Sequence, residues 1–233
     1  MTRSKPAGKV ATKTPSGGST WPPERGRVTA ILRGLDRLYP VADCELHRDN
    51  AFQLLCATIL SAQCTDERVN QVTPKLFARF PTPETMASAP PPVLEDLIRS
   101  TGFFHNKAKS LIGASAAIVK RHAGQVPRTM AELVELPGVA RKTANVVMGT
   151  AFGLTEGIVV DTHVLRLSQR LGITRSTTPE KVEQDLITLI PRERWILFAH
   201  QMIWHGRRIC FARRPDCEHC PLAPHCPSVF HAE

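Results

Sequence analysis

The sequence predicts an all-helical protein. Apolar residues recur at the three- and four-residue intervals of an amphipathic helix along most of the chain, no segment alternates as a strand would, and Gly and Pro separate the helical runs. The chain has 233 residues, of which 42% are hydrophobic, so it can bury one or two proper cores. A wholly disordered or fibrous chain is therefore excluded.

The first three helices have the clearest apolar faces. One begins at Val28 and is stopped by Pro40, a second follows the N-cap residue Asn50, and a third runs from Val69 with Asp66 near its start. Further helices are expected at about 92–100, 106–122, 130–135, 141–152, 162–171, 179–190 and 192–205. Most Leu, Ile and Val side chains in these runs are assigned to the core.

The charge is unevenly spread. The chain carries 30 Lys and Arg against 21 Asp and Glu, a formal net charge of +9, and residues 1–27 alone carry more than half of this excess. Residues 1–22 have no apolar face and are expected to form a disordered basic tail. An excess of positive charge favours nucleic acid as partner, although charge alone leaves a merely soluble basic protein open.

Four of the seven cysteines lie in the last 24 residues, as Cys210-x6-Cys217-x2-Cys220-x5-Cys226. An odd total in an intracellular chain argues against a disulfide framework, and four thiolates at this spacing can wrap one metal centre. Zinc ribbons usually pair two Cys-x2-Cys units and only one is present, so the spacing favours a [4Fe–4S] cluster and leaves zinc open. Arginines in this loop could balance an anionic cluster, face phosphates or simply be solvated.

Residues 136–144 read Leu-Pro-Gly-Val-Ala-Arg-Lys-Thr-Ala, between a short helix at 130–135 and a helix that begins at about Ala140. The first N–H groups of a helix lack internal partners and form a positive pole, and Gly138 would let a phosphate approach the backbone closely. We interpret the segment as a phosphate-binding helix–hairpin–helix, with an ordinary helical corner as the alternative.

Two further residues have the chemistry of a catalytic pair. Lys142 lies in the first turn of the second helix, where the positive helix end favours the neutral amine that can attack carbon. Asp161 directly precedes a helix, so it is expected to be an N-cap, and a carboxylate fixed there could also stabilise a cationic sugar or carry protons. His163 is either a phosphate contact or a structural residue.

Four segments together resemble the endonuclease III family of helix–hairpin–helix DNA glycosylases and AP lyases. They are Leu-Ser-Ala-Gln-Cys-Thr-Asp at 60–66, the hairpin at 136–144, Val-Asp-Thr-His at 160–163 and the cysteine loop, with shorter matches at Gly102, 106–108 and 205–207. The similarity runs from about residue 25 to the C-terminus. It implies two helical domains with DNA bound in the cleft between them: a six-helix barrel over 44–154, and an iron–sulfur cluster domain from 23–43 and 155–233.

The resemblance also implies an activity. A base excision repair glycosylase of this family removes oxidised pyrimidines from double-stranded DNA and cleaves the abasic site by β-elimination, with Lys142 as the Schiff-base nucleophile and Asp161 as the catalytic carboxylate. Gln63 would fill the space left by the flipped base, and Phe103 would stand as a wedge where the family often has Leu. The other implied DNA contacts are Gly138, Val139, Ala140, Arg141, His163, Arg207, Arg213 and Arg214, and the four cysteines would hold a [4Fe–4S] cluster that orders the basic loop.

Two departures from the family pattern concern substrate range and rate. Ala140 stands where a second Gly is usual, so its methyl group could push a phosphate away or restrict φ, and Phe103-Phe104-His105 replaces the commoner Leu-Tyr-Asn.

The alternatives are a weak or inactive DNA-binding relative, a mismatch-type glycosylase, which would lack Lys142, and a zinc-ribbon protein. No run approaches the roughly 20 apolar residues of a membrane span, and no signal-peptide core is present. We expect a monomer without membrane attachment in the cytoplasm, associated with the bacterial nucleoid, and an organellar address stays open.

Overall fold

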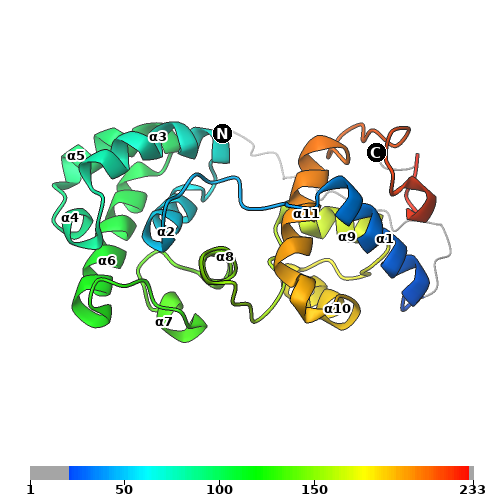
Figure 1. Cartoon of the computed structure of the whole chain (residues 1–233). Coiled ribbons are helices and arrows are strands. Elements are labelled where there is room, and N and C mark those ends of the chain that lie inside the picture. Colours follow the sequence, from blue (N-terminus) through cyan, green and yellow to red (C-terminus); the bar gives the residue numbers. More distant parts are fainter. Residues whose placement is uncertain (1–20, 231–233) are drawn as a thin grey trace, which may run out of the picture.

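The computed structural model describes residues 21–230, which contain helices and no strand (Figure 1). The all-helical prediction is confirmed. The predicted basic tail at 1–22 lies outside the described residues except for its last two. The α-helices are α1 (Arg25–Leu38), α2 (Ala51–Leu60), α3 (Asp66–Arg79), α4 (Pro83–Ala87), α5 (Pro91–Ile98), α6 (Phe104–His122), α7 (Met130–Val134), α8 (Arg141–Phe152), α9 (Thr162–Arg170), α10 (Pro179–Leu189) and α11 (Trp195–Arg208), with 3-10 turns η1 (Arg99–Thr101), η2 (Arg192–Arg194) and η3 (Ala223–His225).

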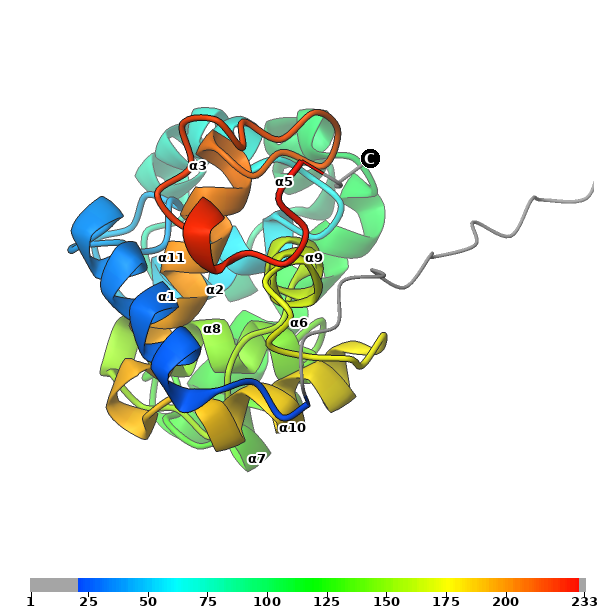
Figure 2. The same cartoon turned by 90° about the vertical axis from the view of Figure 1, so that its right-hand side faces the viewer.

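Buried apolar side chains gather into two separate cores. The first core takes residues from Leu46 to Met148, on α2–α8, and the second takes residues from Val28 to Ala42 together with residues from Ile158 to Leu222. Figure 2 shows α1 beside α11 and the C-terminal segment, although the sequence separates them widely. The N-terminal helix therefore belongs with the C-terminal half, and the domain limits of 44–154 stay a prediction.

The short helix α4 was absent from the sequence expectation, which had six barrel helices where the first core has seven helical segments. Thr82 and Thr85 form a capping box, each side chain accepting a hydrogen bond from the other residue's backbone N–H, and Pro83 takes the first helical position. The letters Thr-Pro-Glu-Thr at 82–85 carried this signal. The last predicted helix, 192–205, is instead a 3-10 turn followed by α11, which ends just before the first cysteine of the loop.

The chain passes between the cores twice, before α2 and after α8 (Figure 1). Trp204 Nε1 donates to the carbonyl of Asp43 at 3.0 Å, so α11 holds the first crossing segment. The helix α8 also packs on α11, because a Cβ at Gly149 would lie only 3.3 Å from Ile196 Cγ1. No helix among residues 21–230 combines the length and hydropathy that a membrane span requires.

Candidate nucleic-acid interface and catalytic site

The turn between α7 and α8 has the geometry of an anion-binding hairpin. Gly138 has φ +78° and an added Cβ would lie 2.5 Å from the Ser110 side chain, so only glycine fits there. Val139 is 5% exposed and its N–H donates to the carbonyl of Leu136 at 3.1 Å, which anchors the turn. The N-terminus of α8 has no side-chain cap, so its first N–H groups are free to bind an anion.

Ala140 is the N-cap of α8 and lies in extended backbone, with φ −86° and ψ 166°. Any residue adopts this conformation without strain, so the expected restriction of φ by its methyl group was wrong. The exposed methyl leaves the effect on phosphate approach as a prediction.

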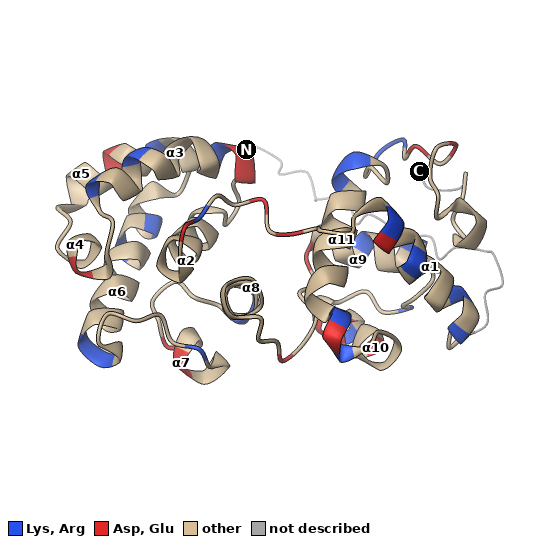
Figure 3. Ribbon diagram, viewed as in Figure 1, with Lys and Arg blue, Asp and Glu red and all other residues tan. Residues whose placement is uncertain are grey.

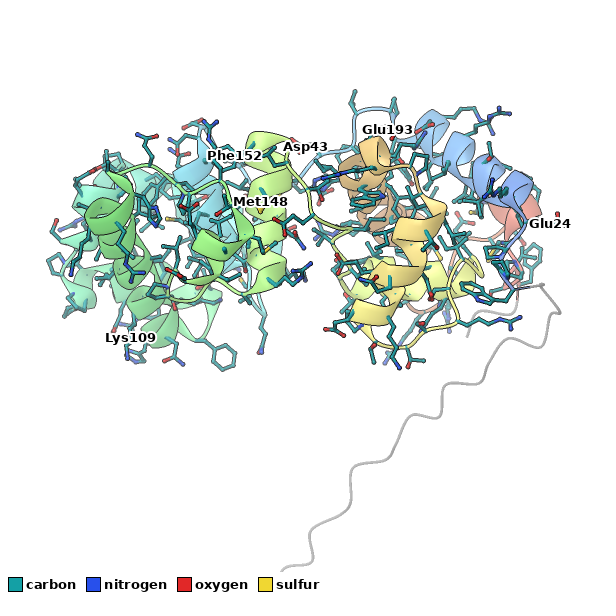
Figure 4. The ribbon with its side chains drawn as sticks, turned by 90° about the horizontal axis from the view of Figure 1, so that it is seen from below. Glu24, Asp43, Lys109, Met148, Phe152 and Glu193 are labelled. Carbon is teal, nitrogen blue, oxygen red and sulfur yellow. The ribbon has the colours of Figure 1, made fainter. Side chains whose placement is uncertain are left out.

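Lys142 is exposed and occupies the second position of α8. Met148 and Phe152 belong to the C-terminal part of α8, and Figure 4 shows them toward the side of the molecule that also carries Asp43 and Glu193. The N-terminus of α8 therefore points toward the opposite side. Lys142 is thus presented at the free end of the helix, beside the hairpin. Its neighbour Arg141 lies 4.0 Å from Glu183 of α10, which brings the hairpin next to the second core.

Asp161 is the N-cap of α9, as predicted. Its Oδ1 accepts hydrogen bonds from the N–H groups of His163 at 2.9 Å and Val164 at 2.8 Å. Both bonds use one oxygen, and Oδ2 has no hydrogen-bond partner among the described residues. No hydrogen bond or ion pair joins Asp161 to Lys142 within residues 21–230, so their mutual approach on bound DNA stays a prediction.

Gln63 and Phe103 both project from backbone of the left-handed region. Gln63 has φ 52° in the turn after α2, and Phe103 has φ 49° at the N-terminus of α6. Both are exposed, and Phe103 is 65% exposed although it is a large apolar residue. An exposed aromatic side chain on a constrained turn suits insertion between bases.

The two residues after Phe103 are held by neighbours. Arg99 covers the ring of Phe104 at 5.2 Å from its centroid, and His105 Nδ1 lies 2.8 Å from Glu95 Oε2. This departure from the family pattern therefore forms an ordered surface beside the exposed Phe103.

The four C-terminal cysteines line a single cavity of about 30 Å³, and its other walls include apolar residues of α9 and the C-terminal segment. Arg170 Nη1 donates to Cys210 Sγ at 3.4 Å, and His205 Nε2 lies 3.5 Å from Cys220 Sγ. Burial raises the pKa of Cys226 to about 11 and lowers the pKa of His205 to about 4. A thiol with so high a pKa becomes a thiolate only when a metal binds it.

The donors around the cavity leave open both metals that the spacing allowed. A zinc ion holds each sulfur at about 2.3 Å, so its ligands must converge on one point. Among the described residues, no three His, Cys, Asp or Glu side chains are arranged to hold a single metal ion. The four cysteines nevertheless line one cavity, and Arg170 directs an N–H group at Cys210 Sγ. The choice between zinc and a [4Fe–4S] cluster stays a prediction.

Two arginines of α9 hold the cysteine loop, residues 210–226, and sequence reasoning missed both. Arg170 donates to the carbonyls of Phe211 at 2.6 Å and Ala212 at 2.9 Å, and Arg166 donates to the carbonyl of Cys210 at 2.9 Å. Their four-residue spacing on one helix was the available signal. Arg213 and Arg214 at the tip of the loop are exposed, as a DNA contact requires.

Arg207, which the sequence predicts to contact DNA, is ion-paired within the protein. Its guanidinium forms ion pairs with Glu45, in the first crossing segment, and with Asp66 of α3 at 2.7 Å. Burial alone would lower the pKa of Arg207, but the two carboxylates outweigh burial and raise it. Figure 3 shows acidic residues in the segment between α1 and α2, near the end of α11. Arg207 therefore joins the two cores, and its contact with DNA stays a prediction.

His163 has the surroundings of a packing residue. Its Nδ1 lies 3.3 Å from Arg166 Nη2, and a Cβ at Gly206 would lie 2.6 Å from the same nitrogen. Burial, as the largest cause, lowers the pKa of His163, so the imidazole is neutral at pH 7. Of the two roles that the sequence left open, the structure favours packing against α11.

Comparison with known proteins identifies the family. Residues 56–192 match the model of the HhH-GPD superfamily base excision DNA repair proteins. Endonuclease III of Synechocystis sp. is 55% identical over 206 residues, which cover 88% of this chain and 94% of that protein. The chain belongs to the HhH-GPD superfamily.

Two solved endonuclease III structures have the same fold. A non-covalent endonuclease III–DNA complex is 43% identical with a TM-score of 0.84, covering 89% of this chain and 97% of that one. A trapped endonuclease III–DNA covalent intermediate is 42% identical with a TM-score of 0.84, covering 89% and 98%. The resemblance read from the sequence motifs is therefore confirmed for the family and for the fold.

Proposed function

We propose that this protein is a base excision repair enzyme that removes oxidised pyrimidines from duplex DNA and then cuts the strand at the abasic site. The observation that carries the proposal is the placement of Lys142, exposed in the first turn of the uncapped helix α8 beside the Gly138 hairpin. An amine there stands next to a phosphate site, within reach of a sugar on the same strand. Membership in a family of base excision repair proteins supports this reading.

DNA binding precedes the chemistry. The hairpin N–H groups hold the backbone, with Arg141 and the exposed Arg213 and Arg214 as further phosphate contacts. A damaged base cannot react inside the stack, so it must be extruded at a cost of a few kcal/mol. Gln63 and Phe103, which project from their turns, offset the lost stacking.

The reaction uses one amine for two steps. The nitrogen of Lys142 attacks C1′, the bond from C1′ to the base breaks, and the base leaves with the bonding electrons and takes up a proton. Opening of the sugar ring gives a Schiff base, loss of the C2′ proton follows, and β-elimination breaks the C3′–O bond. Asp161, fixed as the N-cap of α9, stabilises the cationic sugar and relays protons through its free oxygen.

A [4Fe–4S] cluster bound by Cys210, Cys217, Cys220 and Cys226 would serve structure rather than catalysis, by ordering the loop that carries Arg213 and Arg214. Support comes from the cavity that the four cysteines share and from the Arg170 N–H group directed at Cys210 Sγ. An enzyme with duplex DNA as its substrate would work at the nucleoid as a monomer.

Trapping with borohydride tests the proposal. Reduction converts the Schiff base into a stable covalent bond, so the wild-type protein is expected to be trapped on duplex DNA with an abasic site. Lys142→Ala should lose trapping completely, and Lys120→Ala, which changes an exposed lysine at the far end of α6, should trap normally. Undiminished trapping by Lys142→Ala would assign the nucleophile to another residue.

A substrate panel distinguishes the alternatives. Duplexes with thymine glycol, uracil, or adenine opposite 8-oxoguanine are each the substrate of a different kind of glycosylase, and a duplex with an abasic site tests the lyase step alone. Excision of thymine glycol with strand cleavage agrees with the proposal, and release of adenine without cleavage indicates the mismatch-type enzyme. Binding without cleavage of any duplex indicates a DNA-binding relative that has lost catalysis.

A further inference from the structure

Lys107, in the first turn of α6, is a buried lysine that the proposed chemistry does not use. It is 5% exposed, whereas lysine is almost never buried without a partner. Its ammonium forms no ion pair with a carboxylate of residues 21–230; instead it donates to the carbonyl of Leu60 at 2.8 Å and to the carbonyl of Thr101 at 2.7 Å. Its burial therefore depends on two backbone acceptors.

These acceptors lie at the bases of two different turns. Leu60 is the last residue of α2, three residues before Gln63, and Thr101 ends η1, two residues before Phe103. The backbone N–H of Lys107 also donates to the carbonyl of Phe103 at 3.1 Å. Lys107 thus contacts the base of the turn that carries Gln63, and it binds the turn that carries Phe103 at two carbonyls, those of Thr101 and Phe103.

Both turns require such support. A residue other than glycine with positive φ is strained, and it persists where its surroundings hold it. Gln63 and Phe103 both have positive φ, and Gly102 between the two Lys107 contacts has φ +69°. Carbonyls at helix ends lack internal partners, and a cation is the group that the C-terminus of a helix favours.

Burial of a charged ammonium costs free energy, so a buried lysine without a carboxylate partner indicates that its contacts serve a function, here the positioning of two turns. Burial, as the largest cause, lowers the pKa of Lys107. An apolar residue would fill the same space in the first core at lower cost, but it could not hold two carbonyls from separate turns.

We propose that Lys107 is a positioning residue that ties the turn of Gln63 (residues 61–65) to the turn of Phe103 (residues 101–103), so that the two side chains enter the duplex as one unit. The inference rests on the proposed roles of Gln63 and Phe103 in base extrusion. Extrusion from duplex DNA then depends on Lys107, whereas attack of Lys142 on an abasic site in single-stranded DNA, where no stack must open, does not.

The experiment compares these two reactions in one protein. Lys107→Met removes the charge at nearly constant length, and Lys107→Gln keeps N–H donors with a shorter reach. Lys120→Met is the matched control, because it is the same substitution on an exposed residue of the same helix. Each variant is assayed for single-turnover excision of thymine glycol from duplex DNA and for cleavage of an abasic site in single-stranded DNA. Fluorescence of 2-aminopurine placed beside the lesion reports unstacking.

Loss of two buried hydrogen bonds to a cation is expected to slow duplex excision by Lys107→Met about tenfold or more, with the 2-aminopurine signal reduced in parallel. Cleavage of the single-stranded abasic site should stay within about twofold of wild type. Lys107→Gln should fall between the two, and Lys120→Met should match wild type. Because Gln keeps donors, it also serves if the Met variant does not fold.

A double-mutant cycle decides between positioning and general destabilisation. If Lys107 acts through the two turns, Lys107→Met should add little to the loss already caused by Phe103→Ala together with Gln63→Ala. Losses that multiply, equal slowing of both substrates, or normal duplex excision by either Lys107 variant would overturn the proposal. A wild-type protein that never traps on abasic DNA would instead refute the proposed function, so the two failures are distinguishable.

Discussion

The turn of Phe103 in the first core and the cysteine loop in the second are both held by a cationic side chain that donates to backbone carbonyls. The two regions differ in which segments that side chain joins. Lys107 donates to the carbonyls of two separate turns, whereas Arg170 donates to two carbonyls and a thiol of a single loop. In the first region, both hydrogen-bond acceptors of the Lys107 ammonium are backbone oxygens of the protein, so no bound group is needed to hold the turns. The second leaves four thiols around a cavity, so its order depends on what they bind.

The largest effect should come from removing a cysteine of the loop. In Cys226→Ser, the second core is expected to lose the proposed cluster and the order of the cysteine loop, while the contiguous first core keeps its structure. Limited proteolysis should cut within residues 210–226, and the visible absorbance of the cluster should vanish. Cys44→Ser, at a half-buried cysteine outside the loop, is the control and should keep both properties. A loop that resists protease in Cys226→Ser would remove the contrast between the two regions.

A smaller effect is expected from Arg170. In Arg170→Lys the charge remains but the planar fork that reaches Phe211 and Ala212 is lost. We expect the loop to open more readily, with a stability loss of about 1–3 kcal/mol and weaker duplex binding. Hydrogen exchange of the loop amides measures this, and unchanged exchange would show that the cluster alone holds the loop.

Substitutions of Arg207 and Arg214 compare a residue that joins the two cores with a residue that is proposed to contact DNA. A phosphate contact contributes about one unit to the salt slope of affinity, so Arg214→Ala should flatten that slope by about one. Arg207→Ala should leave the slope unchanged and instead lower the stability by roughly 1 kcal/mol, because its partners are Glu45 and Asp66. Binding titrations at several salt concentrations, with urea unfolding of each variant, test both. A flatter slope in Arg207→Ala would restore it to the DNA surface.

The smallest effect concerns pH. His200 of α11 lies 3.5 Å from Thr150 Oγ1 and 4.0 Å from Asp43, and burial, as the largest cause, lowers its pKa although Asp43 and Asp161 oppose the shift and Arg48 adds to it. The unfolded chain protonates this residue near pH 6.5 while the folded protein does not. Its stabilisation is therefore present above that pH and declines as the pH falls.

In His200→Gln, the decline of stability between about pH 7 and pH 5 should be shallower by a fraction of a kcal/mol, since His163 and His205 still contribute. Urea unfolding at a series of pH values measures this. An equally steep decline in the variant would show that His200 is protonated in the folded protein.

The sequence could predict those features that depend on residues close together in the chain. Asp161 was recognisable as an N-cap because capping depends on neighbouring residues, and the hairpin was recognisable because its Pro-Gly turn is local. Ala140 was misjudged because φ at this position is set by the surrounding turn, which places it in extended backbone.

The contacts that the sequence did not reveal join distant segments. The ion pairs of Arg207 with Glu45 and Asp66 could not be predicted, because nothing in the neighbouring sequence indicates either partner. The sequence around Lys107 does not distinguish it from a lysine on the surface. Its partners are the backbone carbonyls of Leu60 and Thr101, and every residue has a carbonyl, so the sequence cannot indicate which ones it contacts.

The two crossings between the cores have a consequence for synthesis on the ribosome. The first core is built from one uninterrupted stretch, Leu46 to Met148, so it can fold as soon as that stretch has left the exit tunnel. The helix α1 is made earlier, but its partners on α11 and at Leu222 are made only after the whole first core. Until those partners are made, the nascent chain carries an amphipathic helix with an uncovered apolar face, so α1, the first of the described helices to emerge, is buried only after the first core.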